Sequence, residues 1–424
     1  NENSVILYTI VDNNLAKYLA NVSDEKKIPC FGVLGNLILN FSKILNQKAS
    51  HEPSGQHALN DEYYERIEAI QFTMNHDDGN LTEEIEKSDI VLIGVCEARN
   101  STSNKGCDNG QSRIRESLYR LNSTVNCNVA DLGNIVQGKS IEDTYSAVSE
   151  VVKDLVSNGK FVIILGGSQD LTYANYLGYE KLEQTINLVS IDDKIDISAN
   201  DKAHFSCSSF LNKIVLHQPN YLFNFSQLAF QSYYTKKSQL KLLDDLYFEY
   251  LRLGDLQSNI SLSEPFVRNA DILSVDLKSI RKSEFKSAKG IGPNGLFGNE
   301  MCQLMKYAGM SDKLSSVGIY EYDSILDDDG SGCELIAQMV LFLMQGFYSR
   351  KGDYPASLKS DNIKYVVHHD EIDHSLVFYK SPKSDRWWLE VPYPPREDFK
   401  FDRHHLVPCS YDCLLYTSDA ADDS

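Results

Sequence analysis

Two short segments of this chain place aspartates and lysines at alternating positions. Asp192, Lys194 and Asp196 share one segment, and Asp276 and Lys278 have the same spacing in another. Carboxylates gathered in one pocket are ligands for divalent cations, and two cations about 3.5–4 Å apart can ionise a bridging water for attack on a substrate. A protonated lysine has no lone pair to give a metal ion. The segments therefore carry the acids of a two-metal hydrolytic site with ammonium groups set among them.

Each segment follows a run of apolar, β-rich residues. Ile186–Ile191 precedes Asp192, and Ile272–Val275 precedes Asp276. A third run, Phe161–Leu165, leads into Gly-Gly-Ser-Gln169. Open α/β sheets bind ligands at the carboxyl ends of their strands. We therefore expect the three segments to meet in one pocket at that edge of a sheet.

Further apolar runs alternate with helical patterns. Strands that are apolar throughout are typical of a parallel sheet covered on both faces. The predicted fold class is α/β, a three-layer α/β/α sandwich with a mainly parallel sheet, followed by a small β-rich C-terminal extension. The remaining predicted elements are the strands Ile90–Val95, Cys127–Leu132, Leu228–Phe230, Leu251–Gly254 and Ser316–Tyr320 and the helices Ser112–Leu121, Ile141–Ser157 and Glu334–Phe347.

Composition suggests four regions. Residues 1–87 are predicted to be an N-terminal lead-in, residues 88–349 the α/β domain, and residues 350–412 the β-rich extension. Residues 413–424 break with the preceding composition and resemble translated adapter sequence, so we interpret them as a non-native tail.

The three segments resemble motifs of the arginase, agmatinase and formimidoylglutamase superfamily, which read Gly-Gly-x-His, Asp-x-His-x-Asp and Ser-x-Asp-x-Asp. Gln169, Lys194 and Lys278 stand where that superfamily carries metal ligands. The retained ligand positions are Asp192, Asp196 and Asp276. The resemblance extends from about residue 89 to Tyr348 and is greatest to a bacterial formimidoylglutamase-like branch. It implies an arginase-like fold, and it places Glu321 at a substrate-facing position. The alternative interpretation of Glu321 is an ordinary acid at the end of a strand.

The replacements suggest how such a pocket could exist without metal. Three aspartates with two ammonium groups have about the same formal charge as four aspartates with two divalent cations and a hydroxide. Interleaved lysines would relieve repulsion between the carboxylates. Arg281 and Lys282 also replace an acidic stretch of the family with a basic one.

Three hypotheses follow. The first is an arginase-fold protein without a metal or other cofactor, catalytically inactive and acting by binding an unknown small molecule or protein. The second is a hydrolase of C–N bonds in a linear amidine or guanidine, such as formimidoylglutamate, for which manganese would be required. The third is nucleophilic or base chemistry by a lysine of the altered pocket.

Charge and cysteine content exclude several classes of protein. The 424 residues carry a net charge of −19, and no cluster of five basic residues occurs, so nucleic acid and anionic membranes are not expected partners. The nine cysteines form no Cys-x-x-Cys pair. With no signal peptide or membrane-length apolar run, we expect a cytoplasmic protein that could form homo-oligomers.

Two other patterns carry less weight. Gly290–Gly295 satisfies Gly-x-Gly-x-x-Gly, but it follows a polar stretch and contains a proline, so we interpret it as a loop. His368–His374 contains three imidazoles and three acids. Neighbouring side chains of a strand point to opposite faces, so only about half of them could share one metal ion.

Overall fold

The computed structural model describes residues 85–123, 126–197, 206–355, 361–369, 374–391 and 404–415, together with a few short stretches before residue 33. The chain separates into two compact units, Asn1–Ala69 and Ile70–Ser424. In the first unit, β1 (Ile6–Tyr8) pairs in parallel with β2 (Cys30–Gly32).

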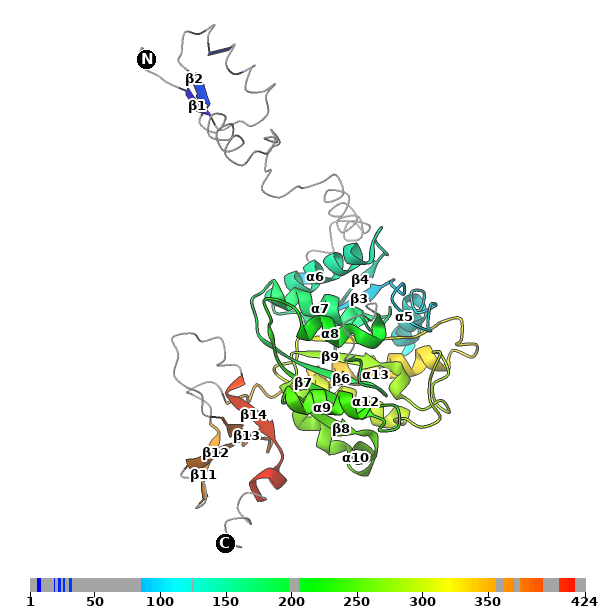
Figure 1. The fold of residues 1–424 in the computed structure, drawn as a ribbon, viewed down its shortest axis with the longest axis vertical. Coiled ribbons are helices and arrows are strands. Elements are labelled where there is room, and N and C mark those ends of the chain that lie inside the picture. Colours follow the sequence, from blue (N-terminus) through cyan, green and yellow to red (C-terminus); the bar gives the residue numbers. More distant parts are fainter. Residues whose placement is uncertain are drawn as a thin grey trace. The chain divides into compact units, whose positions relative to one another are not determined.

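An eight-stranded parallel sheet forms the centre of the second unit (Figure 1). Its strand order is β4-β3-β5-β10-β9-β6-β7-β8, so the chain crosses over repeatedly, as a parallel sheet requires. The strands are β3 (Ile90–Val95), β4 (Val129–Ile135), β5 (Phe161–Leu165), β6 (Ile186–Ile191), β7 (Leu222–Phe230), β8 (Glu249–Arg252), β9 (Ile272–Asp276) and β10 (Ser316–Tyr320). The predicted mainly parallel sheet is confirmed.

Alternate residues of the strands enter two separate cores. In β3, Ile90 and Leu92 pack into one core, whereas Val91 and Ile93 pack into the other. Because both faces of the central strands are buried, their sequences are apolar throughout. Helices therefore cover the sheet on both sides and complete the predicted three layers (Figure 1).

The helices divide between the two faces. The first core takes side chains from α5 (Gln111–Arg120), α10 (Leu253–Ser258), α11 (Glu264–Asn269), α12 (Gly298–Gly309) and α13 (Ser331–Phe347). The second takes them from α6 (Ile141–Ser157), α7 (Leu171–Glu180), α8 (Phe210–Val215) and α9 (Lys237–Asp245). Helix α6 begins with a capping box, in which Ser140 and Asp143 each bond the other's backbone N–H.

Strand β7 is longer than predicted. It begins at Leu222, and its first three residues are partly or fully exposed, with Asn224 and Ser226 set among apolar residues. Asn224 and Ser226 donate hydrogen bonds to Glu249 of β8, at 3.0 and 3.2 Å. The prediction of Leu228–Phe230 therefore covered only the last, buried residues of this strand, which lead toward the carboxyl edge of the sheet.

The predicted β-rich extension is a four-stranded antiparallel sheet of β11 (Ile363–His369), β12 (His374–Lys380), β13 (Trp387–Glu390) and β14 (Leu406–Cys409). One link between this sheet and the α/β domain is Arg268 of α11. The buried guanidinium donates to the carbonyls of Trp387 and Cys409 and pairs with Glu264 at 3.1 Å. It also lies over the Trp388 ring, 4.6 Å from the centroid.

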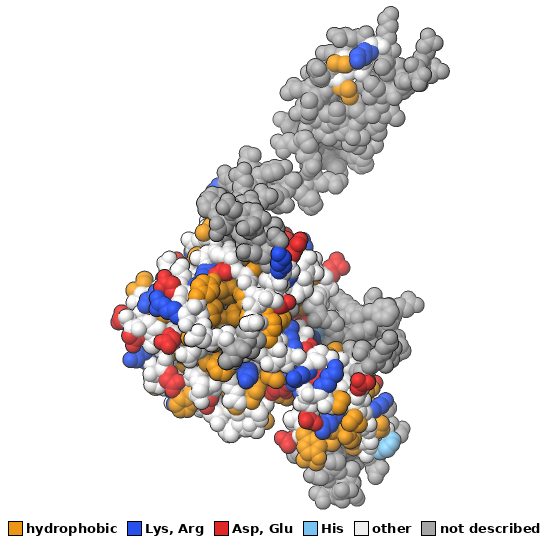
Figure 2. All heavy atoms as spheres, turned by 180° about the vertical axis from the view of Figure 1, so that it is seen from behind, with side chains coloured by type: hydrophobic (Ala, Val, Ile, Leu, Met, Phe, Trp, Pro, Cys, Tyr) orange, Lys and Arg blue, Asp and Glu red, His pale blue; other side chains and the backbone are white. Residues whose placement is uncertain are grey.

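The surface has a mixed character. On the face drawn in Figure 2, basic and acidic side chains are interspersed, and hydrophobic side chains gather in separate patches. Among the helices of the described residues, none has both the length and the apolar character that crossing a bilayer would need.

Candidate functional site

A tight turn after β5 brings Gln169 into the interior. Gly166 and Gly167 both adopt φ of +81°, a conformation that favours glycine. A Cβ on Gly167 would lie 2.2 Å from a methyl carbon of Leu171 and 3.0 Å from the carbonyl oxygen of Glu97. The two glycines therefore permit a close turn that leaves the Gln169 side chain fully buried.

Three aspartates surround the Gln169 carboxamide. With its nitrogen facing them, Gln169 Nε2 lies 3.0 Å from Asp192 Oδ2, 3.0 Å from Asp196 Oδ2 and 3.2 Å from Asp276 Oδ2. Parallel pairing of β6 with β9 places Ser190 opposite Ser274, which aligns the ends of these two strands. An amide nitrogen has two hydrogens, so it cannot donate fully to three carboxylates at once.

Lys278 supplies the positive charge of this cluster. Its ammonium nitrogen lies 3.2 Å from Asp276 Oδ2 and 3.2 Å from Glu321 Oε2, and its side chain is largely buried. Asp276 also accepts the backbone N–H of Lys278 at 2.7 Å. Although burial acts to lower the pKa of Lys278, the two carboxylates raise it well above its ordinary value. Lys278 is therefore protonated at neutral pH.

Lys194 does not join the cluster, contrary to the expectation that two lysines balance the aspartates. Its side chain is 45% exposed, and its ammonium lies 3.9 Å from Asp193 Oδ2. The same group lies over the Tyr234 ring, 5.3 Å from the centroid. The segment after β6 no longer follows strand alternation, so residue 194 points outward. Among the residues that the structure describes, the buried counter-charge of this cluster thus comes from Lys278.

The excess of carboxylates is reflected in their pKa values. Burial raises the pKa of Asp192 well above its ordinary value, and the neighbouring carboxylates of Asp196 and Asp276 raise it further. Burial raises the pKa of Asp196 to about 7, although the charge of Lys278 acts in the opposite direction. Both protonation of carboxyl groups and the charge of Lys278 therefore reduce the negative charge of this cluster.

The pKa of Asp196 leads to a testable pH dependence. Its unfolded value is about 3.9, so the stability gained from the protonated form is present at low pH and is lost as the pH rises through about 7. We expect the unfolding free energy of Asp196→Asn, minus that of the original protein, to increase by about 2.6 kcal/mol between about pH 5 and pH 8. Urea denaturation at several pH values measures this. The exposed control Asp154→Asn should show no such trend, and parallel curves for all three proteins would contradict the assignment.

Hydrogen bonds and an ion pair fix the position of Glu321. It follows β10 with a φ of +73°, which is uncommon for a residue other than glycine. Its Oε1 accepts the backbone N–H of Gln169 at 3.1 Å, and its backbone carbonyl accepts a hydrogen bond from Asn104. Burial raises its pKa, although Lys278 acts to lower it. Its carboxylate is thus engaged by Gln169 and Lys278 rather than directed at an open cavity.

Two residues of this region were not among the sequence candidates. Asp193 is buried, and burial raises its pKa. It directly follows Asp192. Strand alternation would have placed its side chain on the opposite face from Asp192, so it was not chosen as a site residue. Cys207 lies near enough to influence the pKa of Lys278, and burial raises the pKa of its own thiol to about 11. No motif surrounds Cys207 that could have indicated this position.

The donor set does not fit the dinuclear metal site that the motifs imply. The Gln169 amide lies among the three aspartates, and the Lys278 ammonium lies between Asp276 and Glu321, where each would compete with a cation. Within the described residues, no group of three or more His, Cys, Asp or Glu side chains is arranged to hold a metal ion. Protonated carboxyls are also poor ligands for Mn²⁺.

The two weaker sequence patterns have simple outcomes. Gly290–Gly295 is a loop between η3 (Leu277–Ser279) and α12, as predicted. In the histidine-rich stretch, residues 370–373 lie outside the described residues. His368 forms a 2.7 Å hydrogen bond with Ser375 across β11 and β12.

Solved structures with the same fold include formiminoglutamases and an agmatine ureohydrolase. The *Trypanosoma cruzi* formiminoglutamase with Mn²⁺ matches with a TM-score of 0.58 at 16% identity, covering 63% of this chain and 95% of that one. The formimidoylglutamase of *Bacillus subtilis* matches at 0.56 and 17%, covering 65% and 94%. The agmatine ureohydrolase of *Thermoplasma volcanium* matches at 0.55 and 18%, covering 64% and 94%. At these identities the likeness shows the fold alone.

A different likeness covers the N-terminal region. Residues 1–101 match the model of the kinase/pyrophosphorylase family. A putative pyruvate, phosphate dikinase regulatory protein of *Pelagibacter ubique* is 77% identical over 95 residues, which is 22% of this chain and 35% of that protein. The corresponding protein of *Chelativorans* sp. is 42% identical over 94 residues. The chain spans about a third of the length of these curated relatives.

The larger match begins within the same region. The model described as the Arginase family matches residues 88–345, which include every strand of the eight-stranded sheet and all seven candidate site residues. Residues 88–101, with strand β3, are covered by both family models. Because the match extends over more than half of the sequence and agrees with the fold, this chain belongs to the Arginase family.

Proposed function

We propose that this protein is a metal-independent, catalytically inactive member of the Arginase family that acts by binding a small molecule or another protein. The observation that carries the proposal is the position of Lys278. Its buried ammonium lies 3.2 Å from both Asp276 and Glu321, two carboxylates at positions that the family uses for metal and substrate. A permanent positive charge there opposes the binding of a cation.

The arrangement around Gln169 supports the same proposal. A carboxamide replaces an imidazole, and its nitrogen is within hydrogen-bonding distance of three aspartates. A two-metal hydrolase needs those carboxylates to be ionised and available to the metal ions. Here the amide, the ammonium and bound protons satisfy them instead.

A hydrolase of linear amidines or guanidines is the alternative. The likeness in fold to formiminoglutamases and the retained Glu321 favour it, with formimidoylglutamate as the substrate suggested by the resemblance. Lysine-based chemistry has less support, because a nucleophilic lysine requires a lowered pKa whereas that of Lys278 is raised well above its ordinary value. Lys194 is too exposed for a comparable role.

Metal content and product release separate these possibilities. The protein would be incubated with MnCl₂, freed of loose metal and analysed for bound manganese, then assayed with formimidoylglutamate, agmatine and arginine for formamide or urea. We expect far less than one manganese per chain and no product. The *Bacillus subtilis* formimidoylglutamase, treated in parallel, is the positive control. Near-stoichiometric manganese with product release would refute inactivity, and product release insensitive to EDTA would favour the lysine hypothesis.

A cytoplasmic location is also proposed. Cys107, Cys207, Cys302 and Cys333 are buried thiols rather than disulfides. Buried thiols without disulfides are typical of proteins from reducing compartments.

A further inference from the structure

A polar cavity lies at the ends of β7 and β8. Its volume is about 380 Å³, and its polar wall includes Gln231, Tyr233, Arg252, Arg281 and Asn294. It contains two arginines but no acidic residue among those that line it. This composition is unusual for a chain with a net charge of −19.

Arg281 is oriented without an acidic partner. Its Nε and Nη2 donate to the carbonyl oxygen of Gly295, at 3.2 and 3.0 Å. Its guanidinium carbon lies 3.3 Å from the centroid of the Phe297 ring, which fixes the plane of the group. Within the described residues, no carboxylate lies within ion-pair distance of Arg281. The charge of this rigidly held arginine is therefore left for a ligand.

Arg252 contributes a second guanidinium. Its Nε and Nη2 bond to Asp255 at 3.0 and 3.1 Å, and no hydrogen bond from its Nη1 occurs in the described part of the chain. The side chain is 59% exposed, so its pair with Asp255 is a weak surface interaction. An anion could therefore share Arg252 with Asp255 at little cost.

The neutral wall of the cavity is also ordered. Tyr233 donates its hydroxyl hydrogen to Gln231, and Asn294 donates to the Tyr233 hydroxyl at 3.4 Å. Gln231 in turn donates to the backbone carbonyl of Asn294 at 3.0 Å. These amide and hydroxyl groups are preorganised hydrogen-bonding groups, which reduces the entropy lost on binding a ligand.

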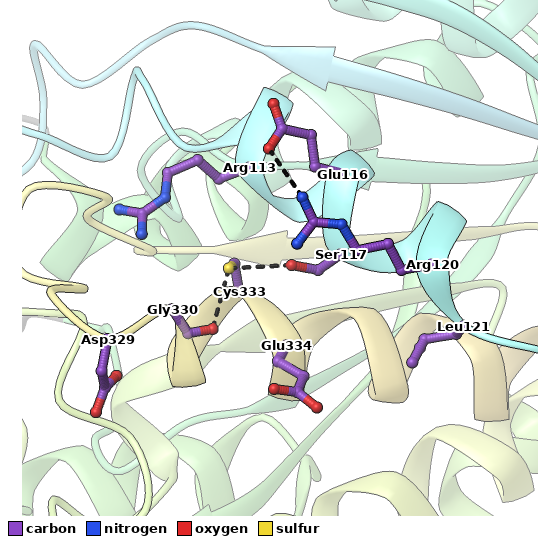
Figure 3. Close-up of a pocket in the computed structure, with 9 residues that line it drawn as sticks. All are labelled: Arg113, Glu116, Ser117, Arg120, Leu121, Asp329, Gly330, Cys333 and Glu334. Carbon is purple, nitrogen blue, oxygen red and sulfur yellow. Dashed lines mark hydrogen bonds and ion pairs between the residues drawn. The ribbon is translucent and has the colours of Figure 1, made fainter.

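A comparable cavity between α5 and α13 shows why the absence of acids matters. It also contains two arginines, Arg113 and Arg120 (Figure 3). Its other lining residues include three acids, Glu116, Asp329 and Glu334, and Figure 3 shows Arg120 directed at Glu116. The acids that line that cavity offset its arginines. In the cavity beside β7 and β8, Asp255 offsets Arg252 from outside the lining, and Arg281 has no carboxylate within ion-pair distance among the described residues.

We propose that the cavity lined by Arg252 and Arg281 binds a small molecule through a carboxylate or phosphate group. The planar guanidinium groups provide paired donors for such an oxyanion. The proposal is independent of whether the aspartate cluster has any activity.

Isothermal titration calorimetry on the full chain, at constant ionic strength, tests the proposal. Succinate and L-glutamate would probe for carboxylate recognition, and inorganic phosphate for phosphate recognition. We expect saturable binding of at least one class of anion. Arg281→Gln and Arg252→Gln should each weaken it by about tenfold, because each removes charge-assisted hydrogen bonds. The control Arg120→Gln, whose side chain is 79% exposed in the other cavity, should bind like the original protein.

The test remains valid if one of the two variants fails to fold. Arg252 is exposed, so Arg252→Gln should keep the original melting temperature and remains informative even if Arg281→Gln is destabilised. Stronger binding of phosphate than of both carboxylates would assign the site to phosphorylated ligands, and the reverse order would assign it to carboxylates. The absence of saturable binding for all three anions, or unchanged affinity in Arg252→Gln and in folded Arg281→Gln, would overturn the proposal.

Discussion

Lys278→Met should lower the free energy of unfolding by about 3–5 kcal/mol at neutral pH. Methionine has nearly the same length but no charge, so the change leaves Asp276 and Glu321 buried without the ammonium that lies 3.2 Å from each. The loss should be smaller in acid, where Glu321, whose pKa is raised by burial, can take up a proton. Urea denaturation near pH 5 and near pH 7.5 would measure both values.

Lys194→Met is the matched control. The same substitution removes an ammonium that is 45% exposed and 3.9 Å from Asp193, so we expect a loss below about 1 kcal/mol. Equal losses in the two variants would show that both lysines balance the aspartates, as the sequence alone suggested. A negligible loss for Lys278→Met would remove the basis of the charge-substitution account.

Restoring the family's ligand types should create manganese binding. The triple variant Gln169→His, Lys194→His, Lys278→Asp would add an imidazole and a carboxylate directly to Asp192, Asp196 and Asp276. Position 194 points outward in this structure, so the second imidazole would join them only if manganese drew it inward. Without metal the triple variant should be less stable than the original protein, because another carboxylate joins the buried cluster and the ammonium is lost. Manganese at about a hundred times its dissociation constant should then stabilise it by about 2.7 kcal/mol.

The control for this prediction keeps the ammonium in place. Gln169→His alone retains Lys278, so manganese should change its melting temperature as little as that of the original protein. Differential scanning calorimetry with and without MnCl₂ measures all three proteins. If manganese stabilised the original protein as much as the triple variant, Gln169 and Lys278 would not be substitutes for metal ions.

The convergence of the site could be predicted because it depends on the sheet. Gln169, Asp192 and Asp276 follow parallel strands, and the carboxyl ends of such strands share one edge. Glu321 follows β10, which lies between β5 and β9 in the same sheet. The apolar runs that form these strands are easy to recognise in the sequence, and the strands place the residues at their ends. The convergence of these residues could therefore be predicted.

The directions of Asp193 and Lys194 could not be predicted in the same way. Both follow the last residue of β6, where the chain leaves the strand and alternation no longer fixes the side chains. In the structure the aspartate is buried and the lysine is exposed. Because the backbone changes direction after β6, the Lys194 ammonium lies outside the pocket in which the sequence pattern had placed it.

Other features lacked a periodic signal. Strand β14 has four residues, includes Pro408, and was not predicted, because proline is unfavourable inside a sheet except at edges. It is indeed an edge strand of the C-terminal sheet. The N-terminal likeness to regulatory proteins of pyruvate, phosphate dikinase was likewise invisible to apolar patterning, since it consists of residue-by-residue identity over 95 positions.

The most direct test is a crystal structure of the protein grown with excess MnCl₂, with anomalous differences collected at the manganese edge. We predict no anomalous peak among Asp192, Asp196 and Asp276, with the Lys278 ammonium in contact with Asp276 and Glu321. Two strong peaks bridged by these aspartates, with Lys278 displaced from them, would contradict the account.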